Sequence, residues 1–85
     1  MDKKQILVIE DDPEIQAALR TALEFFDFDV ISAFNGKEGL EKLATMERRP
    51  CAILLDLMMP VMNGWQFAEE IERKPEYSNI PIVVI

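Results

Sequence analysis

The hydrophobic positions of this chain form short continuous runs that alternate with longer segments of mixed polarity. Residues 6–9, 51–55 and 80–85 are apolar runs in which β-branched side chains are frequent. Such runs are typical of strands that are buried on both faces. Residues 30–33 form a weaker candidate, whose pattern is closer to alternation. We therefore predict four strands, and Pro81 fits only near the start of the last one.

The segment after the first run has the pattern of a helix with one apolar face. Asp12 is well placed as the N-cap, and Pro13 fits the first helical position, where its missing N–H costs nothing. Apolar side chains then recur at three- and four-residue spacing, which predicts a face that packs on the sheet. The residues of this face are Ile15, Ala18, Leu19, Ala22, Leu23 and Phe26.

Two further helices are predicted between the remaining runs. One opens at Asn35 and Gly36, and the other ends at Lys74, because the residue before a proline resists the α region. Their inward residues are Leu40, Leu43 and Ala44 in the first, and Phe67, Ala68 and Ile71 in the second. The elements then alternate as β-α-β-α-β-α-β, as in short βαβ units. We therefore expect an α/β fold with a parallel sheet covered on both faces.

Composition and charge narrow the classes of function. The chain has 85 residues, a net charge of −7 and no histidine. One small domain is expected. Its acidic charge disfavours binding to nucleic acids or to anionic membranes, which needs a basic surface. Histidine-based catalysis and most zinc sites are excluded. The single cysteine, Cys51, fits a reducing compartment. No apolar run is long enough to span a bilayer or to form a signal peptide, so we expect a cytoplasmic domain.

Acidic residues follow two of the predicted strands. Glu10, Asp11 and Asp12 come directly after the first strand, and Asp56 comes directly after the third. The carboxyl ends of parallel strands meet at one edge of a sheet, which is where such folds bind ligands. If these strands are neighbours, Glu10, Asp11 and Asp56 meet in one crevice. Carboxylates without a thiol or an imidazole favour a hard cation, and Mg²⁺ suits an open site of this kind.

Each of these acidic residues also has a simpler interpretation. Asp12 is more readily explained as a helix cap than as a ligand. Glu10 and Asp11 could lie in a solvated loop. Asp56 could simply end its strand, but it would then face the other acids without compensation. The joint pattern favours a metal site over these separate explanations.

Three blocks of the sequence resemble the receiver domain of two-component response regulators. They are residues 6–12 (ILVIEDD), residues 54–60 (LLDLMMP) with Asn63 and Gly64, and residues 80–85 (IPIVVI). The spacing of the blocks agrees, so the resemblance covers the whole chain. It implies an incomplete doubly wound, flavodoxin-like sheet with strand order 2-1-3-4. Residues 1–85 would form a truncated receiver domain that lacks the family's fourth and fifth helices and its fifth strand.

The resemblance also implies a role for each matching residue. Asp56 would be the phosphoacceptor and would attack a phosphohistidine of a sensor histidine kinase or phosphotransfer protein, a signalling role rather than an enzymatic one. Asp11 would bind Mg²⁺ directly and Glu10 through a water, beside Asp56 and the backbone carbonyl of Met58. An aspartate attacks an anionic phosphoryl group poorly until a divalent ion neutralises the oxygens.

Two parts of the chain call for separate expectations. Pro60 and Gly64 would shape the loop, with Gly64 allowing a backbone conformation that bulkier residues resist. The family's hydroxyl residue immediately after the fourth strand and its lysine at the end of the fifth are absent, so phosphotransfer by this fragment should be impaired. The apolar residues of the last strand, Ile80, Ile82, Val83, Val84 and Ile85, show no alternation, so the strand would be a bare edge and we expect self-association, for example as a symmetric dimer.

Other functions are kept as alternatives. The chain could be a truncated or engineered structural fragment that self-associates and has no phosphotransfer activity. An aspartyl-phosphate hydrolase would carry its nucleophile after the first strand, whereas Asp56 follows the third. A dinucleotide-binding enzyme needs a glycine-rich turn after the first strand, where this chain has residues 10–13 (EDDP). Both enzyme classes fit poorly.

Overall fold

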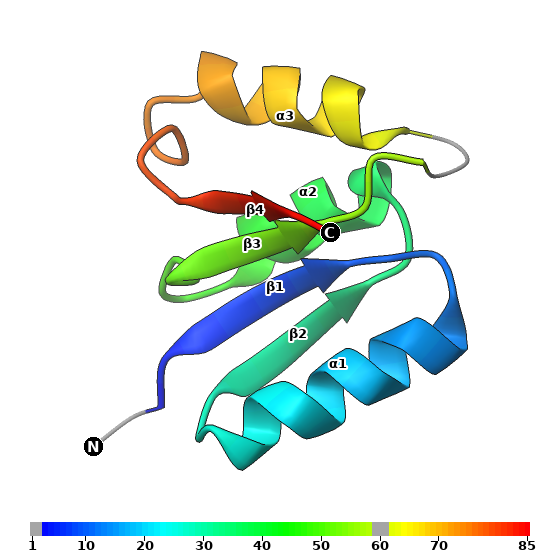
Figure 1. The fold of residues 1–85 in the computed structure, drawn as a ribbon. Helices are drawn as coiled ribbons and strands as arrows, with labels where there is room; N and C mark the ends of the chain where they lie inside the picture. The colour runs from blue at the N-terminus through cyan, green and yellow to red at the C-terminus, as the bar shows by residue number, and fades with distance from the viewer. Residues whose placement is uncertain (1–2, 59–61) are drawn as a thin grey trace.

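The fold is a four-stranded parallel sheet between helices, as a computed structural model shows for residues 3–58 and 62–85 (Figure 1). The strands are β1 (Gln5–Ile9), β2 (Asp29–Ala33), β3 (Ala52–Leu55) and β4 (Ile82–Val84). They pair in the order β2-β1-β3-β4, and every pairing is parallel. The predicted α/β class and the strand order 2-1-3-4 are both confirmed.

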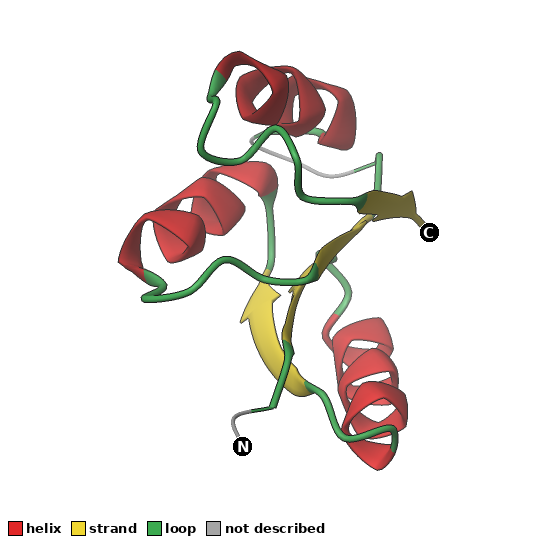
Figure 2. Ribbon diagram, turned by 90° about the vertical axis from the view of Figure 1, so that its left-hand side faces the viewer, coloured by secondary structure: helices red, strands yellow, loops and turns green. Residues whose placement is uncertain are grey.

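The helices divide between the two faces of the sheet. α1 (Pro13–Phe25) lies on one face, and α2 (Gly36–Thr45) and α3 (Gly64–Arg73) lie on the other, as Figure 2 shows. The chain runs one way across the sheet from β1 to β2 and the opposite way from β2 onward. Because parallel crossovers are right-handed, this reversal places α1 opposite the other two helices. None of the helices in the described ranges has the length and apolar composition that crossing a membrane requires.

Each face of the sheet carries its own apolar cluster, because alternate strand residues point to opposite sides. Leu7 and Ile9 point into the larger cluster, together with Phe67 and Ile71 of α3. Val8 points into the smaller cluster under α1. The remaining buried strand residues of these clusters are Ala33, Ile53 and Leu55 in the larger, and Ile6 and Val30 in the smaller.

α1 is rotated about its axis from the predicted orientation, so the face that packs on the sheet overlaps the predicted face only in part. Leu19 and Leu23 pack on the smaller cluster as expected, but Ile15 is 44% exposed and Phe26 is 70% exposed. The third residue on the inward line is the buried Gln16. Apolar spacing identifies a helix, but its rotation about its own axis depends on the surface on which it packs. The predicted residues that are also exposed are Ala18 and Ala22 of α1 and Ala44 of α2.

β4 forms an edge of the described sheet. It follows β3 in the strand order, and its Val84 pairs with Leu55. Val84 is 56% exposed, and Val83 and Ile85 are exposed as well. The strand predicted over residues 80–85 is shorter in the structure, and Ile80, which precedes it, is buried in the larger cluster.

Candidate functional site

The carboxyl ends of β1 and β3 lie side by side in the middle of the sheet. Their register pairs Ile9 with Leu55, the last residue of each strand. The pairing continues for one more residue, because the backbone N–H of Asp56 donates to the carbonyl oxygen of Ile9 at 3.0 Å. The residues that leave the two strands therefore emerge at the same edge. This is also where the strand order reverses, the usual ligand-binding position of such sheets.

Three carboxylates meet at this edge. Glu10, Asp11 and Asp56 each offer one oxygen, and these oxygens all lie within 4.8 Å of one another. Glu10 is buried, Asp56 is half-buried and Asp11 is exposed. The prediction that these residues meet is confirmed. Like charges at this separation repel one another, so the arrangement favours a bound proton or a bound cation.

The electrostatics of this cluster act most strongly on Glu10. Burial raises the pKa of Glu10 above its ordinary value of 4.5, and Asp11 and Asp56 raise it further. The backbone N–H of Asp12 donates to Glu10 Oε1 at 3.1 Å and lowers the pKa in part. The folded chain therefore binds a proton at Glu10 more tightly than the unfolded chain does. The contribution of Glu10 to stability consequently falls as pH rises from about 4.5 through its raised pKa.

Asp12 serves as the helix cap that the sequence predicts. Its Oδ1 accepts hydrogen bonds from the backbone N–H groups of Glu14 at 2.8 Å and Ile15 at 3.4 Å. Pro13 takes the first helical position. The side chain of Asp12 is therefore engaged with α1, while Glu10 and Asp11 supply two of the three carboxylates of the cluster.

The loop after β3 folds back on the cluster. The backbone N–H of Met58 donates to Asp56 Oδ1 at 3.0 Å, which restrains the Asp56 side chain. The backbone N–H of Gly64 donates to the carbonyl oxygen of Leu57 at 3.1 Å and ties the start of α3 to this loop. Pro60 lies outside the described residues.

Gly64 corrects one prediction. It does not have a positive φ, so it does not supply a conformation that other residues resist. Gly64 instead allows the start of α3 to pack closely against the backbone of the loop after β3. A Cβ at this position would lie 2.6 Å from Leu57 Cα and 2.8 Å from the carbonyl oxygen of Asp56, both backbone atoms.

Gln16 is a residue of this region that sequence reasoning missed. Its side chain lies beneath the loop from β1 to α1 and donates to backbone carbonyl oxygens of both β1 and β2. A signal was present in the sequence, because Gln16 precedes Leu19 by three residues and Leu23 by seven, on one helical stripe. A polar residue at that spacing was easily passed over beside the more apolar neighbouring stripe.

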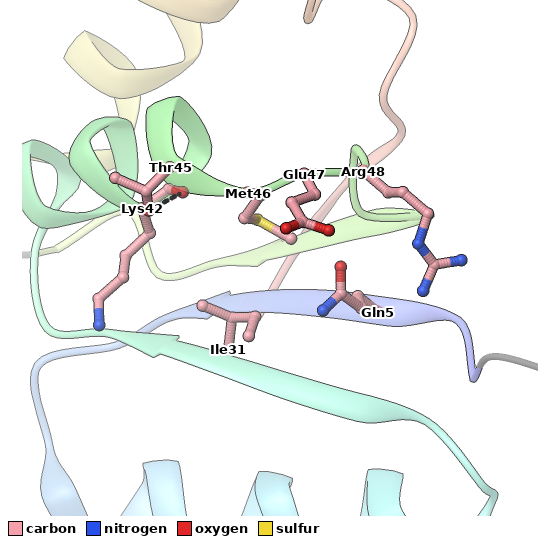
Figure 3. A pocket seen from close by; sticks show the side chains of 7 residues that line it. All are labelled: Gln5, Ile31, Lys42, Thr45, Met46, Glu47 and Arg48. Carbon is pink, nitrogen blue, oxygen red and sulfur yellow. Dashed lines mark hydrogen bonds between the residues drawn. The ribbon is translucent and has the colours of Figure 1, made fainter.

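A separate hollow of about 520 Å³ lies beside the C-terminal end of α2 (Figure 3). It carries charges of both signs on Lys42, Glu47 and Arg48, which are all exposed. Gln5, at the start of β1, also lines it, whereas Glu10 follows the end of that strand. The remaining lining residues are Ile31, Thr45 and Met46. With no buried polar group directed into it from the described residues, the hollow is a weaker candidate than the acidic cluster.

The sequence of this chain matches a known protein family. Residues 6–85 match the sequence model of the response regulator receiver domain. The sensor histidine kinase CheAY of Helicobacter pylori is 35% identical over 80 residues, which are 94% of this chain and 10% of that protein. The probable transcriptional regulator ycf27 of Porphyridium aerugineum is 36% identical over 85 residues, which are 100% of this chain and 33% of that protein. The chain thus spans a third or less of these curated relatives.

Solved structures of receiver domains have the same fold as this chain. The N-terminal domain of a response regulator receiver protein from Methanoculleus marisnigri JR1 is 39% identical, with a TM-score of 0.88 over 94% of this chain and 63% of that chain. The signal receiver domain of a histidine kinase from Syntrophus aciditrophicus is 28% identical, with a TM-score of 0.90 over 96% of this chain and 61% of that chain. The chain therefore spans somewhat less than two thirds of each solved domain.

Proposed function

Because this chain belongs to the response regulator receiver domain family, we propose that it accepts a phosphoryl group on Asp56 from a phosphohistidine. The donor would be a sensor histidine kinase or a phosphotransfer protein. The observation that carries the proposal is the meeting of Glu10, Asp11 and Asp56 at the ends of β1 and β3. Receiver domains act as phosphoacceptors in two-component signalling, and the proposal assigns that role to one carboxylate of this cluster.

The donor set fits Mg²⁺. The three carboxylates offer oxygen ligands alone, which is the preference of a hard cation. As the family resemblance implies, Asp11 would bind Mg²⁺ directly and Glu10 would act mostly through a metal-bound water. Asp56 and the backbone carbonyl of Met58 would complete the protein's share of the site. A bound Mg²⁺ supplies neutralisation of the phosphoryl oxygens.

The chain's own residues then account for the transfer. A carboxylate oxygen of Asp56 attacks phosphorus, the P–N bond of the phosphohistidine breaks, and its electron pair stays on the imidazole. The Met58 N–H restrains Asp56 Oδ1, so the nucleophile is oriented before the donor arrives. Two neighbouring carboxylates would oppose the approach of an anionic phosphoryl group. The cluster should therefore be active only while a divalent cation compensates this charge.

The test uses a small phosphoryl donor. We expect the chain to gain the mass of one phosphoryl group when it is incubated with acetyl phosphate and Mg²⁺, and to gain none when EDTA is present. Intact-mass spectrometry measures the extent, and peptide mapping locates the site. A chain that neither binds Mg²⁺ nor gains mass would contradict the proposed function.

A second candidate function is self-association, which the exposed apolar edge of β4 favours. Edge strands of this kind pair with other chains unless charges or cover prevent it. We expect light scattering to show a mass that rises with concentration, and Val84→Lys to lower it towards the monomer. Thr45→Lys, which adds the same charge at an exposed position on α2, should leave the mass unchanged. A wild-type chain that stays monomeric at every concentration would refute the idea.

A further inference from the structure

We propose that Gln16 is a positioning residue, which holds the Glu10–Asp11 peptide in place and thereby sets the Mg²⁺ affinity of the acidic cluster. The inference rests on the proposed function for the identity of the metal. Gln16 does not touch the metal or the phosphoryl group. It acts through the backbone of the residues that do.

The side-chain amide of Gln16 joins three segments of backbone. Nε2 lies within hydrogen-bond distance of the carbonyl oxygens of Val8 at 3.0 Å, Glu10 at 3.1 Å and Ala33 at 2.8 Å, and its two hydrogens serve these three acceptors, so one hydrogen is shared. Val8 lies in β1, Ala33 ends β2, and Glu10 is the first residue after β1. One buried amide therefore fastens the start of the acidic loop to the ends of two strands.

The orientation of this amide follows from its surroundings. If the amide were flipped, Oε1 would face three carbonyl oxygens, which are all acceptors. In the observed orientation, Oε1 is buried without a hydrogen-bond partner among residues 3–58 and 62–85. Burial of an unpaired acceptor costs stability, and an apolar residue at this position of α1 would avoid that cost. The hydrogen bonds from Nε2 are what the chain gains in return.

These hydrogen bonds act on the cluster because of which carbonyl they hold. The carbonyl of Glu10 belongs to the peptide unit that joins Glu10 to Asp11, so its orientation decides where both side chains start. The same loop is closed from the other side, where the backbone N–H of Asp12 donates to Glu10 Oε1 and Asp12 caps α1. Gln16 lies one turn further along this helix. The loop is thus held between the cap of α1 and the amide that the first turn carries.

Gln16→Met tests the inference, because methionine has a similar length and helix propensity but no N–H donor. We expect the dissociation constant for Mg²⁺ to rise about tenfold or more, the usual effect of removing a hydrogen bond that orients a ligand. A Mg²⁺ titration followed by backbone amide NMR measures it. At saturating Mg²⁺, the rate of phosphorylation by acetyl phosphate should return close to that of the wild type. Hydrogen exchange of the Asp12 amide without metal should become faster.

Two further variants keep the result interpretable. Leu23→Ala removes packing from the same face of α1 at the far end of the helix, so it should lower stability without changing Mg²⁺ affinity. Gln16→Asn retains an amide but withdraws it by one methylene, so it should weaken Mg²⁺ binding as well, and it replaces Gln16→Met if that variant does not fold.

The outcomes separate the inference from the proposed function. If the wild type binds Mg²⁺ and the folded Gln16 variants bind it equally well, Gln16 does not position the cluster, and the proposed function stands. If Leu23→Ala weakens binding as much as Gln16→Met does, the role of Gln16 is merely structural and the inference fails. If the wild type itself does not bind Mg²⁺, the proposed function fails first, and the inference about metal affinity fails with it.

Discussion

Asp56→Asn should abolish phosphoryl transfer to this chain and should stabilise the Mg²⁺-free protein. The amide cannot act as the nucleophile, so we expect no gain in mass with acetyl phosphate and Mg²⁺. The same change removes one of three charges whose oxygens lie within 4.8 Å of one another. Relief of that repulsion is worth on the order of 1 kcal/mol for partly solvated groups, and this corresponds to a rise in Tm of about 4–8 °C for a domain of this size. The pKa of Glu10 should fall towards its ordinary value, because Asp56 helps to raise it.

Thermal denaturation with and without Mg²⁺ measures the second effect. Mg²⁺ should raise the Tm of the wild type, because it binds the folded cluster and the unfolded chain lacks that cluster. It should raise the Tm of Asp56→Asn less. Asp29→Asn is the matched control, since it makes the same chemical change at an exposed residue at the start of β2. If Asp56→Asn still takes up a phosphoryl group while Asp29→Asn behaves as the wild type does, Asp56 is not the phosphoacceptor.

Gly64→Ala should lower stability and disturb the cluster together. The added Cβ would lie 2.6 Å from Leu57 Cα and 2.8 Å from the carbonyl oxygen of Asp56, so backbone has to move. Overpacking of this kind costs about 1–3 kcal/mol. Because the displaced backbone carries Asp56, Mg²⁺ affinity and phosphorylation should fall as well. Urea denaturation measures the loss of stability, and a Mg²⁺ titration measures the loss of affinity.

Gly39→Ala is the matched control for this prediction. Gly39 lies within α2, and a Cβ there would meet only side-chain atoms, Ile9 Cδ1 at 2.6 Å and Phe67 Cε1 at 3.1 Å being the nearest of each residue, so no backbone has to move. Alanine also favours a helix interior over glycine by about 1 kcal/mol, which offsets part of the crowding. We expect Gly39→Ala to have a smaller effect on stability and none on Mg²⁺ affinity. Equal effects of the two substitutions on Mg²⁺ affinity would show that close packing at Gly64 does not shape the site.

The order of the elements and the position of the acidic residues could be read from the sequence, because both depend on local rules. Continuous apolar runs predicted three of the strands and a weaker, more alternating pattern predicted β2, and Asp12 with Pro13 predicted the start of α1; the structure confirms these features. The meeting of Glu10, Asp11 and Asp56 followed from the rule that ligands bind at the carboxyl ends of parallel strands. The roles of these residues towards Mg²⁺ and the phosphoryl group stay predictions.

The carboxylates of the site could be predicted from the sequence, but the residues that hold their backbone in place could not. Gln16 was missed because it lies beside a more apolar stripe, yet the residues of that stripe are exposed in the structure. They are Ile15, Ala18, Ala22 and Phe26. The reason given for Gly64 was wrong, because a glycine in a sequence does not show whether it serves an unusual φ or a close approach. Both errors concern contacts between segments that are distant along the chain.

The sequence by itself determined the alternation of strands and helices, the caps, and which strands are followed by carboxylates, since hydrophobic period and capping act over a few residues. Only the tertiary structure decided the rotation of α1 about its own axis and the hydrogen bonds of Gln16 to two strands. It also decided the contact of Gly64 with the backbone of the loop that carries Asp56. These features depend on how whole elements pack, and packing is decided by the fit of surfaces that no local pattern contains.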